Sequence, residues 1–233
     1  MGVRLANLAA VPLVHTGHSL GRDKRKRLLA KGLDIEQIES TYNMHRRIDA
    51  EERLLANAEL VITSTRNEID SQYGLYDYYN PDGMTVIPPG TNLKRFRPPE
   101  KDESNRFQDR VIPFLSEPEK PVVLALSRPD ERKNIPVLLE AFGNNKQLRD
   151  AANLVIIAGN REDIRDLDRG AESVLTQLLL DLDSYDLYGI VALPKQHNSD
   201  EVPEIYRMGA VSRGVFINPA LTEPFGLTLL EAA

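Results

Sequence analysis

Three stretches of the sequence place charged residues beside glycine or proline directly after a short apolar run. They are HTGHSLGRDKRKR (15–27), SRPDERKNI (127–135) and NPALTEPFGLTLLE (218–231). In open α/β sheets, ligands bind outside the carboxyl ends of the strands. These three stretches are therefore the candidates for a binding or catalytic site.

The first stretch crowds cations at the start of a predicted helix. The cations are Arg22, Lys24, Arg25, Lys26 and Arg27. Cations at a helix N-terminus oppose the helix dipole, so this placement is unfavourable unless an anion shares the site. Gly17 and Gly21 would let the backbone approach a ligand, and His15 and His18 lie at the strand end. The alternatives are a solvated basic face, or a nucleic-acid patch, which the lack of interleaved aromatic residues disfavours.

The second stretch offers two cations for one anion. Arg128 can bind a phosphate or diphosphate as a planar fork, and Lys133 as a point charge. The alternative is a charged turn in which Asn134 caps the next helix. By itself this motif does not decide between the two interpretations.

The third stretch combines a helix start with two carboxylates. Pro224 suits the first turn of a helix. The amides that follow, of Gly226, Leu227 and Thr228, are predicted to hold a diphosphate. Glu223 precedes the helix and Glu231 lies about 10 Å further along its axis, so a nucleotide sugar could place its hexose at one and its ribose at the other. The alternative is an ordinary amphipathic helix with a surface glutamate.

Composition excludes several classes of protein and site. The 233 residues are 41% apolar and 27% charged, as in ordinary globular proteins, and contain no cysteine. Disulfides, cysteine metal sites and a thiol nucleophile are thus excluded, and a cytoplasmic location is expected. The net charge of -6 argues against a general nucleic-acid binder. No apolar run approaches the ~20 residues needed to span a bilayer, so no membrane partner is expected.

Short β-branched runs alternate with helical patterns, which predicts parallel α/β sheets. Strands are expected at 11–17, 60–65, 85–92, 122–127, 154–159, 189–194 and 214–219, and helices at 22–31, 34–58, 66–74, 134–143, 171–183, 202–210 and from about Pro224. A Pro-rich, charged linker is predicted at 98–120, between Rossmann-like domains at 1–97 and 121–233.

The three stretches together resemble the sucrose-phosphate synthases, retaining family-4 glycosyltransferases of the GT-B type, in which two Rossmann-like domains face a cleft. RRIDAEE (46–52), ITSTRNEIDSQYGLYD (62–77), VIPPG (86–90) and DEVPEIYRMGA (200–210) also match that pattern. The resemblance implies glucose transfer with retention from UDP-glucose, or sometimes ADP-glucose, to fructose 6-phosphate. It implies no required cofactor and no protein metal site, so any stimulation by Mg²⁺ would not need one.

The resemblance also implies residue roles. His18, Arg128, Lys133 and Glu223 would be catalytic, with His18 near the reacting glucose carbon. The donor would be held by Arg128, Lys133, Glu223, Phe225, Gly226, Leu227, Thr228 and Glu231. The acceptor phosphate would be held by Ser19, Lys24 and either Arg46 or Arg47, a choice that the sequence leaves open.

Two other functions stay open at this point. Sucrose synthase or another family-4 transferase would share the donor chemistry but use an acceptor without phosphate. A nucleotide-sugar-binding module would bind UDP without catalysis. Compared with the family pattern, residues 1–97 resemble the later half of the acceptor-side domain and 121–233 a donor domain cut short. The chain is therefore expected to be a fragment, weakly active or inactive alone.

Overall fold

The computed structural model describes residues 1–17, 19–100, 103–223 and 225–233. The chain folds as two units, Met1–Pro89 and Gly90–Ala233. The predicted linker, 98–120, lies wholly inside the second unit and contains a helix, α5 (Arg106–Val111), whose Phe107 is fully buried. In the described part of the chain, no helix combines the length and apolar character needed to cross a membrane.

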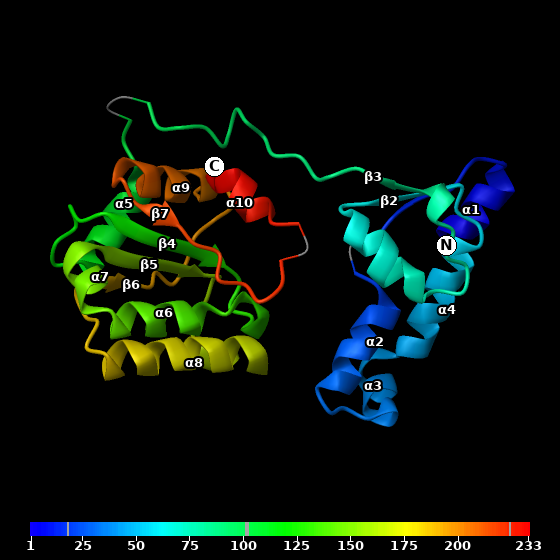
Figure 1. The fold of residues 1–233 in the computed structure, drawn as a ribbon, viewed down its shortest axis with the longest axis horizontal. Helices are drawn as coiled ribbons and strands as arrows, with labels where there is room; N and C mark the ends of the chain where they lie inside the picture. The colour runs from blue at the N-terminus through cyan, green and yellow to red at the C-terminus, as the bar shows by residue number, and fades with distance from the viewer. Residues whose placement is uncertain (18, 101–102, 224) are drawn as a thin grey trace. The chain divides into compact units, whose positions relative to one another are not determined.

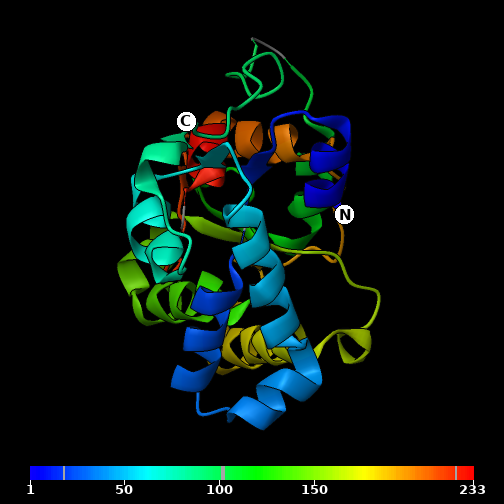
Figure 2. The same cartoon turned by 90° about the vertical axis from the view of Figure 1, so that its right-hand side faces the viewer.

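Unit 1 is built on a three-stranded parallel sheet, β1 (Val14–Thr16), β2 (Leu60–Thr63) and β3 (Met84–Val86), in the order β1-β2-β3. Its helices are α1 (Gly2–Ala9), α2 (Gly21–Ala30), α3 (Ile35–Tyr42) and α4 (Met44–Leu55). Helices α2 and α4 contact each other (Figures 1 and 2). The core of the unit includes Ile38, Met44, Ile69 and Tyr73, all at most 1% exposed.

The single helix predicted over residues 34–58 is wrong, because α3 and α4 are separate. The chain turns at Asn43, whose φ of 49° is left-handed, a conformation that Asn tolerates better than most residues. A capping box formed by Asp34 and Gln37 starts α3. The break changes the direction of the chain just before Arg46 and Arg47, two of the predicted phosphate ligands.

Unit 2 has a four-stranded parallel sheet in the order β6-β5-β4-β7, which is the order 3-2-1-4 of a Rossmann-like sheet when the strands are numbered within the unit. The strands are β4 (Val122–Ser127), β5 (Asn153–Ala158), β6 (Val191–Ala192) and β7 (Val215–Phe216). The other helices are α6 (Ile135–Asn144), α7 (Lys146–Ala151), α8 (Arg169–Ser184), α9 (Val202–Val211) and α10 (Leu227–Ala232).

Both faces of this sheet are covered, α6 and α8 on one side and α5 and α9 on the other (Figure 1). The strand side chains alternate between the two cores. Val123, Leu154 and Ile156 pack with α6 and α8, whereas their neighbours in sequence pack with α5 and α9. Burial on both faces explains why these strands read as continuous apolar runs.

The α8 face provides a test of unit 2. Leu178 is fully buried under the sheet, whereas the next residue, Leu179, is 44% exposed. We expect Leu178→Ala to lower the free energy of unfolding by about 2–5 kcal/mol through lost burial and a cavity. Leu179→Ala should change it by less than about 1 kcal/mol. Hydrogen exchange of the β5 amides reports on this unit alone, and equal losses in both variants would contradict the packing.

Candidate active site

A lysine and a glutamate from distant parts of unit 2 meet at the carboxyl ends of β4 and β7. Lys133 Nζ lies 2.6 Å from Glu223 Oε2, and Asn218 Nδ2 donates to the same oxygen at 3.0 Å. The amide of Leu221 also bonds to the carbonyl of Arg132 at 2.9 Å. The structure thus joins the second and third predicted stretches into one site.

Glu223 is held ionised at this site. Partial burial acts to raise its pKa, but the hydrogen bonds from Lys133 and Asn218, with the charge of Lys133, bring the pKa below 4.5. The remaining lone pairs of the carboxylate can accept hydroxyl hydrogens, and the lysine has further N–H groups to donate. The pair can therefore bind a hydroxyl-rich ligand and an anion side by side.

The three cations of SRPDERKN have different surroundings. Arg132 is occupied, because its Nε and Nη2 bond to Asp130 at 3.0 and 2.6 Å. These bonds, above all, lower the pKa of Asp130 far below its usual range. Arg128 is exposed, and its side chain makes no hydrogen bond or ion pair within the part of the chain that the structure describes. Arg128 and Lys133 remain available for an anion.

The charged-turn alternative is partly right. Residues Glu131–Lys133 form a 3₁₀ turn, but Asp130 caps it, accepting from the amide of Arg132 at 2.9 Å. Asn134 makes no side-chain cap for α6 and instead adopts a left-handed φ of 55°. The cap predicted for Asn134 is therefore wrong.

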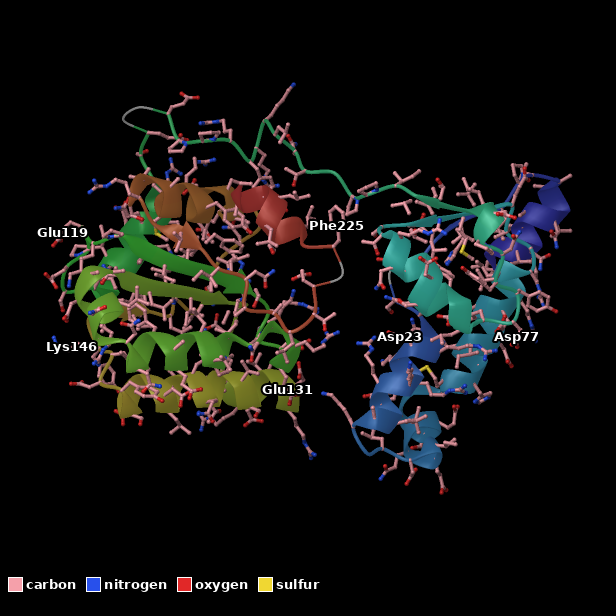
Figure 3. The ribbon with its side chains drawn as sticks, viewed as in Figure 1. Asp23, Asp77, Glu119, Glu131, Lys146 and Phe225 are labelled. Atoms are coloured by element: carbon pink, nitrogen blue, oxygen red, sulfur yellow. The ribbon has the colours of Figure 1, made fainter. Side chains whose placement is uncertain are left out.

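The end of the chain forms a short helix that begins later than predicted. The helix α10 starts at Leu227, after Gly226 with φ 83°, and Pro224 lies outside the described residues. Phe225, labelled in Figure 3, is half-buried just before it. Thr228 lies in the first turn of α10. Diphosphate binding by the amides of this turn stays a prediction.

Glu231 near the end of α10 is partly buried. Tyr206 of α9 donates to its Oε2 over 3.5 Å. Burial raises the pKa of Glu231, which the Tyr206 hydroxyl and the charge of Arg95 oppose. Sequence reasoning named Glu231 but missed both of these partners.

In unit 1 the structure brings together three of the four predicted phosphate ligands. Arg47 Nη2 donates to the hydroxyl of Ser19 at 2.9 Å and to its carbonyl at 2.7 Å. The charge of Arg47 acts on Lys24. Arg46 is exposed and makes no hydrogen bond or ion pair with the residues that the structure places. The structure therefore places Arg47, and not Arg46, against Ser19, and the binding of a phosphate by either arginine stays a prediction.

Lys24 lies in a setting that disfavours its own charge. Its Nζ is 4.0 Å from the centre of the Tyr42 ring, a cation–π contact. Burial, then the charges of Arg47 and Arg27, lower the pKa of Lys24 below 10.5. Like charges gathered in this way favour an anionic ligand.

The carboxylate of Glu51 lies at the N-terminus of α2 and balances the positive end of the helix dipole. It was not identified in the sequence analysis. Glu51 accepts from the amide of Gly21 at 2.9 Å, from Arg47 Nε at 2.9 Å and from the hydroxyl of Tyr76. A Cβ on Gly21 would lie 2.8 Å from this carboxylate. The lack of a side chain at Gly21 therefore makes room for the carboxylate of Glu51, whereas in the sequence analysis it was expected to make room for a ligand. The i,i+4 spacing of Arg47 and Glu51 was the available signal.

The four histidines differ in what the structure says of them. His18 lies outside the described residues, so its predicted catalytic role stays a prediction. His15 is in β1, where its ring meets Tyr73 edge-on at 6.5 Å. His45 Nδ1 is 2.5 Å from Glu39 Oε2. His197 is half-buried in the loop before α9, and burial lowers its pKa.

No group of three or more His, Asp or Glu side chains is arranged to hold a metal ion among the residues described. The predicted ligands instead form two separate sets, Lys133 with Glu223 in unit 2 and Ser19 with Arg47 in unit 1. One set offers a carboxylate and a cation, and the other offers cations and a hydroxyl.

Comparisons with curated proteins find sucrose-phosphate synthases. The chain is 46% identical over 266 residues to a probable sucrose-phosphate synthase 1 of Oryza sativa subsp. indica, covering 98% of the chain and 24% of that protein. It is 47% identical over 270 residues to the sucrose-phosphate synthase of Zea mays, covering 98% and 25%. The chain thus spans about a quarter of the length of these relatives.

Comparison with solved structures identifies the type of fold. A sucrose-phosphate synthase from Thermosynechococcus elongatus matches with a TM-score of 0.65 and 25% identity, over 95% of this chain and 48% of that one. Anabaena HepE in complex with UDP and glucose matches with a TM-score of 0.66 and 17% identity, over 99% and 52%. These likenesses confirm the GT-B type of α/β fold, of which this chain contains a part.

The family model described as "Glycosyl transferases group 1" matches residues 108–233, more than half of the chain. The matched range contains Arg128, Lys133, Glu223 and Glu231. This chain belongs to the group 1 glycosyl transferase family.

Proposed function

We propose that the chain carries the donor and acceptor-phosphate ligands of a sucrose-phosphate synthase. The reaction moves glucose with retention from UDP-glucose to fructose 6-phosphate, giving sucrose 6-phosphate and UDP. The observation that carries the proposal is the grouping of Ser19, Lys24 and Arg47, since a phosphate on the acceptor needs such a site. Relatives named sucrose-phosphate synthase at about 46% identity support the same conclusion.

In this proposal, unit 2 binds the donor, UDP-glucose. Arg128 and Lys133 would bind the diphosphate and stabilise the negative charge that grows on it as UDP leaves. Glu223 would accept hydrogen bonds from glucose hydroxyls, and Glu231 from the ribose. The ion pair with Lys133 supports this assignment, since it keeps Glu223 charged and fixes its position.

Retention is proposed to follow a front-face route. The bond from glucose C1 to the phosphate oxygen breaks, and the acceptor hydroxyl of fructose bonds to C1 from the same face. The hydroxyl proton passes to the departing phosphate oxygen, so that no separate base or cofactor is needed. The proposal also assigns His18 to the reacting glucose and a cytoplasmic location to the enzyme.

The two alternative functions, sucrose synthase and a nucleotide-sugar-binding module, would use the same residues differently. Sucrose synthase would use fructose itself, and Lys24 would then have no phosphate to bind. A nucleotide-sugar-binding module would bind UDP through Arg128 and Lys133 and transfer nothing. The acceptor preference and the presence of transfer distinguish all three.

The acceptor preference is the direct test of the proposal. With radiolabelled UDP-glucose, we expect labelled sucrose phosphate from fructose 6-phosphate at a rate at least tenfold above transfer to fructose. Lys24→Gln and Arg47→Gln should weaken fructose 6-phosphate binding by about 10–100-fold, the loss typical of one charged hydrogen bond. Arg46→Gln is the matched control and should change it by less than about twofold.

Faster transfer to fructose would favour sucrose synthase. UDP binding without any transfer, both in this chain and in a longer chain that completes the acceptor-side domain, would favour the binding module, whereas transfer by the longer chain alone would show that the fragment is inactive by itself. If Arg46→Gln weakened fructose 6-phosphate binding as much as Arg47→Gln, the phosphate site described for unit 1 would be wrong.

The donor site is tested by UDP binding, measured by calorimetry. Lys133→Ala should weaken UDP binding by about 10–100-fold, because a cation on the diphosphate is lost. Arg132→Ala is the control one residue away, since Asp130 already occupies that guanidinium. We expect Arg132→Ala to stay within about threefold of the wild type. Equal losses in the two variants would contradict the assignment of Lys133.

The titration of Lys24 predicts a pH dependence. In the free protein its pKa lies below 10.5, and a bound phosphate would raise that pKa by favouring the charged form. Fructose 6-phosphate affinity should therefore be full at pH values below the free-state pKa and fall as pH rises through it. Lys24→Arg should remove the fall, because a guanidinium stays charged throughout. An identical fall in Lys24→Arg would show that another group is responsible.

A further inference from the structure

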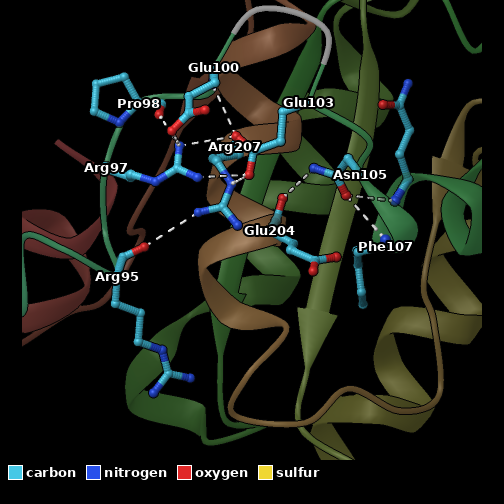
Figure 4. Close-up of polar contacts among 10 residues, drawn as sticks. Arg95, Arg97, Pro98, Glu100, Glu103, Asn105, Phe107, Glu204 and Arg207 are labelled. Atoms are coloured by element: carbon cyan, nitrogen blue, oxygen red, sulfur yellow. Dashed lines mark hydrogen bonds and ion pairs between the residues drawn. The ribbon is translucent and has the colours of Figure 1, made fainter.

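The segment that follows β3 is attached to α9 by a network of charged groups. Arg207 of α9 donates from Nη1 to the carbonyl of Arg95 at 3.3 Å, and its Nε lies 3.5 Å from Glu103 (Figure 4). Glu103 is in turn held by both terminal nitrogens of Arg97 at 3.1 Å. We call residues 95–103, apart from the undescribed 101 and 102, the connector.

Phe96 of the connector packs against Tyr206, whose hydroxyl contacts Glu231. Phe96 lies 6.1 Å from the Tyr206 ring, and Phe216 packs edge-on against the same ring at 5.3 Å. Tyr206 is only 8% exposed, and its ring is buried against these two phenylalanines. Its hydroxyl is directed at Glu231 Oε2, 3.5 Å away.

Arg95 of the connector provides the second influence on Glu231. Its Nη2 donates to the carbonyl of Ser199 and bonds to Asp200 Oδ1 at 3.0 Å, which anchors the guanidinium to the loop before α9. From there its positive charge acts on Glu231. Tyr206 and Arg95 are the groups of α9 and the connector that oppose the effect of burial on this carboxylate.

We infer that Tyr206 and Arg95 are positioning residues for Glu231, so that recognition of the ribose of a bound nucleotide depends on the connector being attached to α9. The inference rests on the proposed function, which gives the ribose to Glu231. A ribose diol donates two hydroxyl hydrogens and needs an ionised carboxylate with a fixed orientation to accept both. The Tyr206 hydroxyl donates to one carboxylate oxygen over 3.5 Å, and the charge of Arg95 favours the ionised form.

If Tyr206 served only to pack the core, a different side-chain property would matter. Phenylalanine would fill the space between Phe96 and Phe216 as well as Tyr206 does, and the hydroxyl would be dispensable. The positioning role requires the hydroxyl itself. Tyr206→Phe therefore distinguishes the two roles with little change in shape.

The first measurement needs no ligand. The carboxyl ¹³C shift of Glu231, followed against pH in the full chain, should show a higher pKa in Tyr206→Phe and in Arg95→Gln than in the wild type, because each change removes a group that favours the ion. Tyr188→Phe and Arg165→Gln are matched controls, whose partners are Asp183 and Asp163. They should leave the Glu231 titration unchanged.

The second measurement is UDP binding by calorimetry between about pH 5 and 8. The ionised form of Glu231 is lost as pH falls through its pKa, so the loss should begin at a higher pH in the two variants. We expect their affinity to be about three- to tenfold below the wild type at the acid end and closer to it at pH 8, as for one lost hydrogen bond. In a Glu231→Gln background, Tyr206→Phe should have no pH-dependent effect.

The outcomes separate the inference from the proposed function. An unchanged Glu231 titration in both variants overturns the inference whether or not UDP binds. A loss of UDP affinity that is the same at every pH, or that persists in the Glu231→Gln background, also overturns it and assigns Tyr206 to packing. A wild-type chain that binds no UDP although its Glu231 titration responds to both variants overturns the ribose role of the proposed function instead.

Discussion

The parallel pairing of β4 with β7 is the constraint on which the candidate donor site depends. It aligns Val123 with Val215 and Leu124 with Phe216, although about 90 residues separate the strands. Because parallel strands end at the same edge, the loops that follow them meet there, and Lys133 reaches Glu223. Gly214 permits the close approach of the two strands, since a Cβ there would lie 2.0 Å from the carbonyl of Val122. A change in this register would separate the cation from the carboxylate.

In unit 1, carboxylates of the protein itself balance the positive charge at the start of α2. The start of α2 needs an anion, and Glu51 supplies it while also orienting Arg47 through Nε. Glu52 similarly pairs with Arg22 at 2.5 Å. The two glutamates thus satisfy groups on the helix start and leave the Nη edge of Arg47 toward Ser19. Glu51 thus occupies the amide of Gly21, where the helix dipole alone would have placed a bound anion, and the predicted phosphate ligand Arg47 bonds to Ser19 through its other nitrogen.

The sequence predicted those features that depend on local pattern. The strands of unit 2 were found because burial on both faces makes them continuous apolar runs, and the cations after β4 were found because strand ends carry ligands. The break at Asn43 was missed because both flanking segments share a helical pattern, and a left-handed Asn leaves no mark in that pattern. Glu51 and Tyr206 were missed because their contacts join segments 25 to 30 residues apart. Such contacts depend on packing, which a single sequence does not display.

The predicted ligands of unit 1 and those of unit 2 balance charge in different ways, and this bears on how each set would select its ligand. Lys133 has a carboxylate partner at 2.6 Å before any ligand binds, so an anion must share the cation with Glu223. Lys24 has no carboxylate partner among the described residues, and its pKa is lowered by burial and by the charges of Arg47 and Arg27, which are themselves paired with Glu51 and Asp23. A compensated pair gains little from charge alone and selects by the fit of a hydroxyl-rich group beside an anion. A lysine without a carboxylate partner gains more from the charge of its ligand, so under the proposed function we expect unit 1 to distinguish a phosphorylated from an unphosphorylated sugar even when the rest of the sugar makes the same contacts.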